Sequence, residues 1–129
     1  MILAIKSDDQ NPEIFLIKNG QPVAEKKWAS NKDLYSSLIG EIKELLVSQN
    51  SGFNYLKGLI VFKGPGSFTG LRIGATVANA LADSLGVPIV GVDGDDWLKS
   101  GLNMLESGQN QKIVIPKYGN PANTTKPKK

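Results

Sequence analysis

Alternating and continuous runs of hydrophobic residues predict short strands along the chain. Residues 2–5 predict the first strand, and residues 13–28 predict a hairpin because the Asn19-Gly20 pair suits a two-residue turn. Two later runs, GLIVF at 58–62 and VPIVGV at 87–92, contain no charged residue and predict buried strands. The pattern therefore predicts a sheet of five strands.

Between these runs, apolar residues recur every three to four positions, which predicts helices. The first helix is expected at 31–47 after Ser30 as its N-cap. The second is expected at about 70–85 with Ser67 or Thr69 as its cap, and a weaker third at 96–106.

The order of these elements predicts an α/β fold in which a mixed five-stranded sheet carries helices on its faces. KIVIP at 112–116 could add a terminal strand. We expect one lobe over residues 1–115 and an irregular basic tail over 116–129. The same order fits a ribonuclease H-like lobe, which is the half-unit of actin and sugar-kinase folds.

The amino-acid composition excludes some kinds of catalytic and metal-binding site. The 129 residues include no Cys and no His, which removes thiolate chemistry and the usual base for catalysis near neutral pH. The net charge of +3 comes from Lys126, Lys128 and Lys129, because 15 − 3 leaves 12 basic residues against 12 acidic ones. MILAI lacks a basic leader and is followed by charged residues, so we expect a cytosolic protein with no membrane partner.

The stretch KGPGSFTGLRIG at 63–74 places four glycines between a predicted strand and a predicted helix. Such a turn can hold a phosphate through backbone N–H groups, so a small nucleotide-binding enzyme is one alternative. The spacing departs from a Walker motif, since five residues separate Gly64 from Gly70. Pro65 also removes one donor and Phe68 adds bulk. A purely structural turn, in which glycine supplies unusual backbone angles, explains the same residues.

The helix after this turn is predicted to have a wide apolar surface. Its small residues share one stripe: Gly70, Gly74, Ala78 and Ala82. Its larger apolar residues form a stripe beside it: Ile73, Val77, Leu81 and Leu85. This arc is wider than one sheet face requires, so a second helix of the same chain or of another subunit should pack there. Arg72 is expected in the first turn, where a cation is unfavourable by about 0.3–1 kcal/mol unless an acid pairs with it.

GPGSFTGLRIG, with its preceding apolar strand and the following ATVANALADSLGVPIVGV, closely resembles the signature of the bacterial TsaB (YeaZ) family. MILAIKSDD and IKNGQPVAEKKW are similar to that family's opening strands, so the resemblance covers most of residues 1–92. PKYGNPANTTKPKK is somewhat similar to its C-terminal tail.

This resemblance implies a ribonuclease H-like lobe of the actin and sugar-kinase superfamily that does no chemistry itself and uses no cofactor. It implies docking on a TsaD subunit, which transfers the threonylcarbamoyl group to N6 of adenosine 37 in tRNA. Family members associate through helices of the first lobe, as homodimers or with TsaD. A separate ATPase subunit is a further candidate partner that this resemblance implies.

We therefore predict partner contacts from the first two helices, at Leu38, Ile42, Gly70, Leu71, Arg72, Ile73, Gly74, Ala78, Leu81 and Ala82. The motif turn before them consists of Gly64, Pro65, Gly66, Ser67, Phe68 and Thr69. The tail lysines Lys126, Lys128 and Lys129 are candidate contacts to tRNA phosphate.

The chain departs from the family pattern in two ways. Family members usually have a second lobe of comparable size, so a short single-lobe member is expected. Lys6 stands where the family commonly has an Asp linked to metal, and the next central strand also ends in a lysine, Lys63. Both cations oppose metal binding, so no metal site and no two-metal nuclease is predicted.

Overall fold

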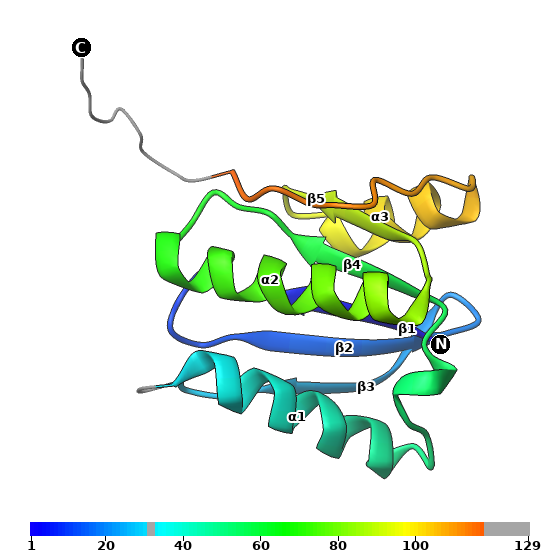
Figure 1. The fold of residues 1–129 in the computed structure, drawn as a ribbon, viewed down its shortest axis with the longest axis horizontal. Coiled ribbons are helices and arrows are strands. Elements are labelled where there is room, and N and C mark those ends of the chain that lie inside the picture. The colour runs from blue at the N-terminus through cyan, green and yellow to red at the C-terminus, as the bar shows by residue number, and fades with distance from the viewer. Residues whose placement is uncertain (31–32, 118–129) are drawn as a thin grey trace.

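A computed structural model describes residues 1–30 and 33–117, and its centre is one mixed sheet. The strands are β1 (Ile2–Lys6), β2 (Glu13–Lys18), β3 (Gln21–Lys27), β4 (Gly58–Phe62) and β5 (Ile89–Val92). They lie in the order β3-β2-β1-β4-β5, as Figure 1 shows. β1 to β3 are antiparallel, whereas β1, β4 and β5 are parallel. The predicted five-stranded mixed sheet is confirmed.

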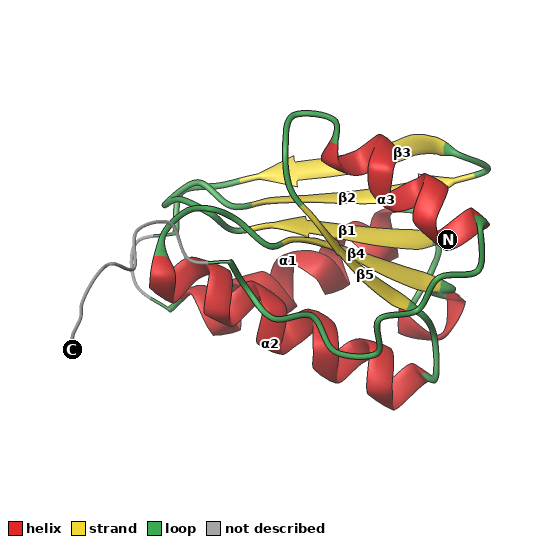
Figure 2. Cartoon of the chain, turned by 90° about the horizontal axis from the view of Figure 1, so that it is seen from above, coloured by secondary structure: helices red, strands yellow, loops and turns green. Residues whose placement is uncertain are grey.

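Helices cover both faces of this sheet. They are α1 (Leu34–Ser48), α2 (Phe68–Leu85) and α3 (Trp97–Glu106), with a short 3₁₀ helix η1 (Phe53–Tyr55). α1 and α2 lie on one face and α3 lies on the other (Figure 2). Because successive residues of a strand point to opposite faces, Leu3 and Ile5 enter the core under α1 and α2, while Ala4 enters the core under α3. None of the described helices has the length and apolar composition needed to cross a membrane.

The N-terminus of α1 differs from the sequence prediction. Asp33, and not Ser30, is its cap: Asp33 Oδ1 accepts from the backbone N–H of Ser36 at 3.1 Å, and Oδ2 accepts from Ser36 Oγ at 2.9 Å. Both residues are good caps, so the sequence alone did not decide between them. Of the two caps predicted for α2, Ser67 and Thr69, the structure has Ser67, whose Oγ accepts from the Gly70 N–H at 3.4 Å.

The Asp33 cap gives a pH-dependent prediction. Hydrogen bonds from Ser36 stabilise the carboxylate and lower the pKa of Asp33 in the folded state. The unfolded state then takes up a proton first, so the stabilisation is present above about pH 4 and is lost on further acidification. Asp33→Asn keeps an acceptor without titrating. In urea unfolding, the advantage of the wild type over this variant should therefore be constant from about pH 7 to 5 and shrink towards pH 2; parallel curves over the whole range would contradict the assignment.

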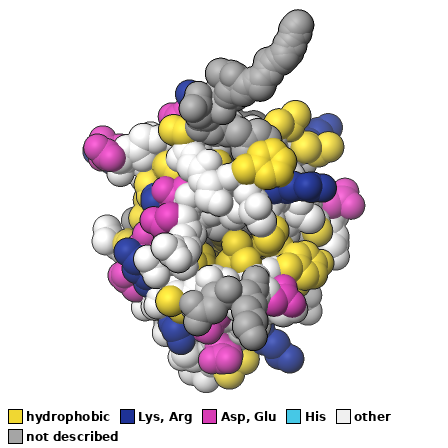
Figure 3. All heavy atoms as spheres, turned by 90° about the vertical axis from the view of Figure 1, so that its left-hand side faces the viewer, with side chains coloured by type: hydrophobic (Ala, Val, Ile, Leu, Met, Phe, Trp, Pro, Cys, Tyr) yellow, Lys and Arg dark blue, Asp and Glu magenta, His cyan; other side chains and the backbone are white. Residues whose placement is uncertain are grey.

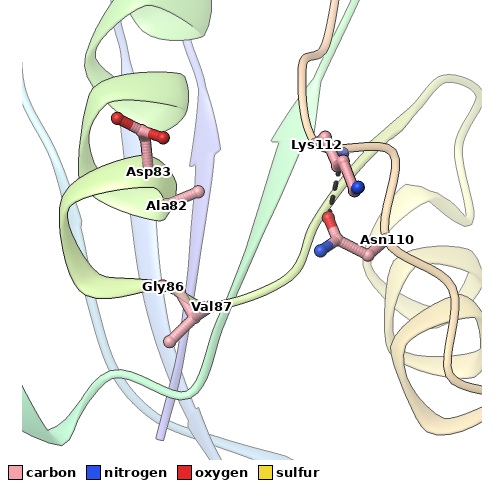
Figure 4. A pocket seen from close by; sticks show the side chains of 6 residues that line it. All are labelled: Ala82, Asp83, Gly86, Val87, Asn110 and Lys112. Carbon is pink, nitrogen blue, oxygen red and sulfur yellow. Dashed lines mark hydrogen bonds between the residues drawn. The ribbon is translucent and has the colours of Figure 1, made fainter.

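Residues 109–117, here called the strap, return along the outer edge of β5. KIVIP is not a strand, so that prediction is wrong. Lys112 has φ = 68°, and the Ile113 N–H donates to the Gln111 carbonyl at 2.7 Å, so the backbone turns where a strand would continue. Figure 4 shows Asn110 and Lys112 of the strap facing the end of α2, with the Lys112 N–H donating to Asn110 Oδ1 at 2.9 Å.

Side chains replace the missing backbone ladder between the strap and the sheet. The Ile89 N–H donates to Asn110 Oδ1 at 3.2 Å, and the Gly91 N–H donates to Gln111 Oε1 at 3.1 Å. On α2, the Asn79 amide accepts from the Val114 N–H at 2.9 Å and donates to the Val114 carbonyl at 3.0 Å. Two amide side chains of the strap and one backbone bond, from the Gln111 N–H to the Ile89 carbonyl at 2.9 Å, therefore close the β5 edge, while Asn79 ties the strap to α2.

Candidate functional site

The glycine-rich turn between β4 and α2 is occupied by the chain itself. A side chain at Gly64, whose φ is 113°, would meet the Lys117 carbonyl oxygen. A side chain at Gly66 would come within 2.5 Å of Asp8 Cβ, and one at Gly70 would meet the Ser7 carbonyl oxygen. These glycines therefore let the turn after β1 and the strap approach the β4–α2 turn. They leave no room for a phosphate on those faces, so the nucleotide alternative gains no support.

The small stripe of α2 is also covered by the chain itself. Gly74 faces the hydroxyl group of Ser7, which is fully buried and donates to the Gly70 carbonyl at 2.8 Å. Ala78 is buried and Ala82 is 3% exposed. The expectation that a partner's helix packs directly on this stripe is therefore corrected: the sheet and the turn after β1 fill it.

Three other predicted contact residues share this burial. Leu38 and Ile42 of α1 are fully buried, and Leu71 of α2 is 1% exposed. They pack in the core, because both helices direct their central apolar stripe at the sheet. Ile73 and Leu81 are half-buried.

The exposed part of α1 and α2 contains a hollow of about 240 Å³. Its lining residues come from both helices: Tyr35, Phe68, Thr69, Arg72, Ile73 and Thr76. Tyr35 is 50% exposed, Phe68 55% and the neighbouring Ile39 38%. Figure 3 looks onto the end of the molecule where both helices begin and shows hydrophobic side chains around a hollowed centre. We call Tyr35, Ile39, Phe68 and Arg72 together the helix-pair surface.

Arg72 is the charged residue of this hollow. The prediction placed Arg72 in the first turn of α2, but α2 begins at Phe68, so Arg72 lies in the second turn. It is exposed, and no carboxylate of the described residues forms an ion pair with it.

Gly40 is an exposed residue in the interior of α1. A side chain there would meet nothing within 4 Å, so the fold itself does not require a glycine at this position. Glycine in a helix interior is unfavourable by about 1 kcal/mol relative to alanine. A glycine without an internal reason is consistent with the close approach of something outside the chain.

Sequence reasoning missed Tyr35, Ile39 and Phe68 as surface residues. A signal was present, since Tyr35 and Ile39 lie one position beyond Leu34 and Leu38 and so widen the apolar arc of α1. A helix that packs on one sheet face buries only part of such an arc. The apolar residues that stay exposed, Tyr35 and Ile39, belong to the helix-pair surface.

Lys6 lies at the carboxyl end of β1, the position at which the resemblance to the TsaB family would imply a metal-linked acid. Its Nζ is 2.7 Å from Asp8 Oδ1 and 4.7 Å from the centre of the Phe62 ring. The carboxylate of Asp8 is thus already paired with a cation. Within residues 1–30 and 33–117, no group of three acidic or other metal-binding side chains lies together.

The antiparallel hairpin followed by parallel strands and two covering helices defines a ribonuclease H-like lobe of the actin and sugar-kinase superfamily. The family described as "TsaD: tRNA N6-adenosine threonylcarbamoyltransferase" matches residues 29–111. The chain belongs to this family, and over part of its length it is a TsaB (YeaZ) family member.

Individual relatives agree with this assignment. The chain is 35% identical over 91 residues to the tRNA threonylcarbamoyladenosine biosynthesis protein TsaB of Bacillus subtilis, which is 70% of this chain and 40% of that protein. For TsaB of Buchnera aphidicola the identity is 33% over 92 residues, or 71% of this chain and 41% of that protein. A tRNA N6-adenosine threonylcarbamoyltransferase of Clostridioides difficile is 37% identical over 71 residues, which is 55% of this chain and 19% of that protein.

The fold is shared with YeaZ from Pseudomonas aeruginosa, with a TM-score of 0.66 and 23% identity over 71% of this chain and 43% of that one. The chain spans about two fifths of the length of the TsaB proteins it matches.

Proposed function

We propose that this chain is a non-catalytic subunit that binds and stabilises a TsaD-type subunit during formation of N6-threonylcarbamoyladenosine at position 37 of tRNA. The names of the relatives, which describe TsaB as a biosynthesis protein of this modification, support the process. The helix-pair surface is the observation that carries the scaffold role. It combines exposed aromatic and aliphatic side chains with one arginine that has no acidic partner, a composition common at the centre of protein interfaces.

A non-catalytic role fits the chemistry of the chain. It contains no His and no Cys, and Lys6 is paired with Asp8 at the strand end where the superfamily's metal-linked acid would stand. The glycine turn is filled by backbone from the β1 side and from the strap. Each of these features supports binding, and not turnover, as the task of this lobe.

Two partner assignments, a homodimer and an additional ATPase subunit, stay predictions. The cytosolic location is also a prediction. The proposed tRNA contacts Lys126, Lys128 and Lys129 lie outside the described residues. The division at residue 115 is also a prediction; Lys117, beyond it, donates its N–H to the Lys63 carbonyl at 2.6 Å.

Arg72→Glu tests the helix-pair surface. The wild-type chain should bind the TsaD-type subunit of its own organism in isothermal titration calorimetry, and the variant should bind at least about tenfold more weakly, which corresponds to about 1.4 kcal/mol. Reversal of the charge replaces attraction to an acidic group with repulsion. Arg72 is exposed, so the thermal midpoint of the free chain should change little.

Lys99→Glu provides a matched control, because Lys99 is an exposed residue of α3 on the opposite face of the sheet. This control changes the net charge equally and should leave the affinity unchanged. Equal weakening by both variants would indicate a general charge effect. Unchanged binding by Arg72→Glu would remove this surface from the interface.

A further inference from the structure

A row of cationic residues crosses the sheet at the amino end of β1. In the strand register, Ile2 pairs with Ile17 on β2 and with Gly58 on β4. One position further out, Met1 therefore lies between Lys18 and Lys57, and the Lys57 N–H donates to the Met1 carbonyl at 2.7 Å. Neighbouring strands are about 4.8 Å apart, so the two lysines start about 10 Å from each other.

The side chains of this row point to the same face of the sheet. Leu3, Leu16 and Leu59, which lie two residues from Met1, Lys18 and Lys57 respectively, belong to the core under α1 and α2. The row therefore emerges on that face, where α1 ends. Figure 1 shows this N-terminal end at the side of the molecule opposite to the start of α1 and α2.

A hollow of about 380 Å³ opens at this place. The lining residues are Met1, Lys18, Gln49, Asn50, Ser51, Tyr55 and Lys57. Tyr55 is 62% exposed, although its ring is large and apolar. The hollow thus offers two ammonium groups, polar amides and an accessible aromatic ring, but no acidic side chain.

The positive charges of the row act on one another. No carboxylate of the described residues forms an ion pair with Lys18 or Lys57. Partial burial lowers the pKa of the Met1 amino group, and the charges of Lys57 and Lys18 lower it further. A bound anion would relieve this repulsion.

We propose that this hollow, the Lys18–Tyr55–Lys57 site, binds the backbone of single-stranded RNA with one base stacked on Tyr55. The two lysine side chains can each contact one phosphate of the backbone, and such contacts make binding weaken with salt. An exposed ring beside a cationic groove is the arrangement that single strands use, because each base has a face that can stack. A plain anion would use the lysines and have no use for the tyrosine.

The site is independent of the helix-pair surface and of the proposed scaffold role. The test measures fluorescence anisotropy of a labelled twelve-residue oligouridylate with the full chain at several salt concentrations. The double variant Lys18→Gln/Lys57→Gln should bind at least tenfold more weakly at low salt. Its slope of log affinity against log salt should also be shallower by about 1.4, which is 0.7 for each lost phosphate contact. Tyr55→Ala should lower the affinity at least fivefold at every salt concentration.

The double variant Lys43→Gln/Lys99→Gln removes the same charge from exposed positions outside the hollow and should retain wild-type binding. Sodium polyphosphate serves as the second probe, and Tyr55→Ala should not affect its binding. If oligouridylate binding is insensitive to Tyr55, the site is a plain anion site and the RNA assignment is overturned. If Lys18→Gln/Lys57→Gln lowers the thermal midpoint but leaves RNA binding unchanged, the lysines serve only the C-terminal end of α1 and the proposal is overturned.

Discussion

Gly70→Ala is expected to lower the free energy of unfolding by about 3 kcal/mol, a large part of the 5–15 kcal/mol typical of a domain. Alanine would gain about 1 kcal/mol of helix propensity. Its Cβ would however meet the Ser7 carbonyl oxygen, which is backbone and cannot rotate away. Separating β1 from α2 adds overpacking strain of about 2 kcal/mol. The shift also stretches the buried bond from Ser7 Oγ to the Gly70 carbonyl, whose loss costs about 2 kcal/mol.

Urea unfolding followed by circular dichroism measures this change. Gly40→Ala is the matched control, because it makes the same substitution in an α-helix at a site where nothing lies within 4 Å. That variant should raise the free energy of unfolding by about 1 kcal/mol. If both variants were more stable than the wild type, helix propensity, and not contact with Ser7, would decide both results.

Gly74→Ala is expected to cost about 2 kcal/mol, and this cost should depend on Ser7. The added Cβ would meet the Ser7 hydroxyl, which is buried and already committed to the Gly70 carbonyl. Once Ser7 is changed to alanine, the hydroxyl is gone, and the next atom of Ser7 lies 3.3 Å from the added carbon. The double variant Ser7→Ala/Gly74→Ala should therefore be at least about 1 kcal/mol more stable than the sum of the single changes predicts.

The same urea titrations give this coupling energy. Ser7→Ala alone should be destabilising by about 1–2 kcal/mol because it leaves a buried carbonyl without its donor. Additive effects within about 0.5 kcal/mol would mean that Gly74 is not limited by Ser7.

The two proposed binding surfaces lie at opposite ends of the lobe. The helix-pair surface is at the start of α1 and α2, whereas the Lys18–Tyr55–Lys57 site is at the amino end of β1. A protein partner and an RNA strand could therefore be bound at the same time without competing for a residue. This arrangement suits a subunit that holds a modifying enzyme close to its substrate.

Local sequence patterns were sufficient for most of the secondary structure. A period of two predicts strands and a period near 3.6 predicts helices, because these periods follow from backbone geometry alone. The Asn19-Gly20 turn and the buried β4 were both readable in this way. The Asp33 cap and the strap were not, since each depends on a choice among local alternatives that the rest of the fold makes.

The sequence by itself determined the order of the elements, the mixed sheet and the family, all of which rest on spacing and on the motif at 64–74. It also showed that Gly70 and Gly74 share one side of a helix. Only the tertiary structure decided what approaches that side, because the register of β1 against β4 brings Ser7 there from 63 residues away in the chain. A periodic pattern fixes which residues share a face, but the neighbour of that face is set by packing between distant segments.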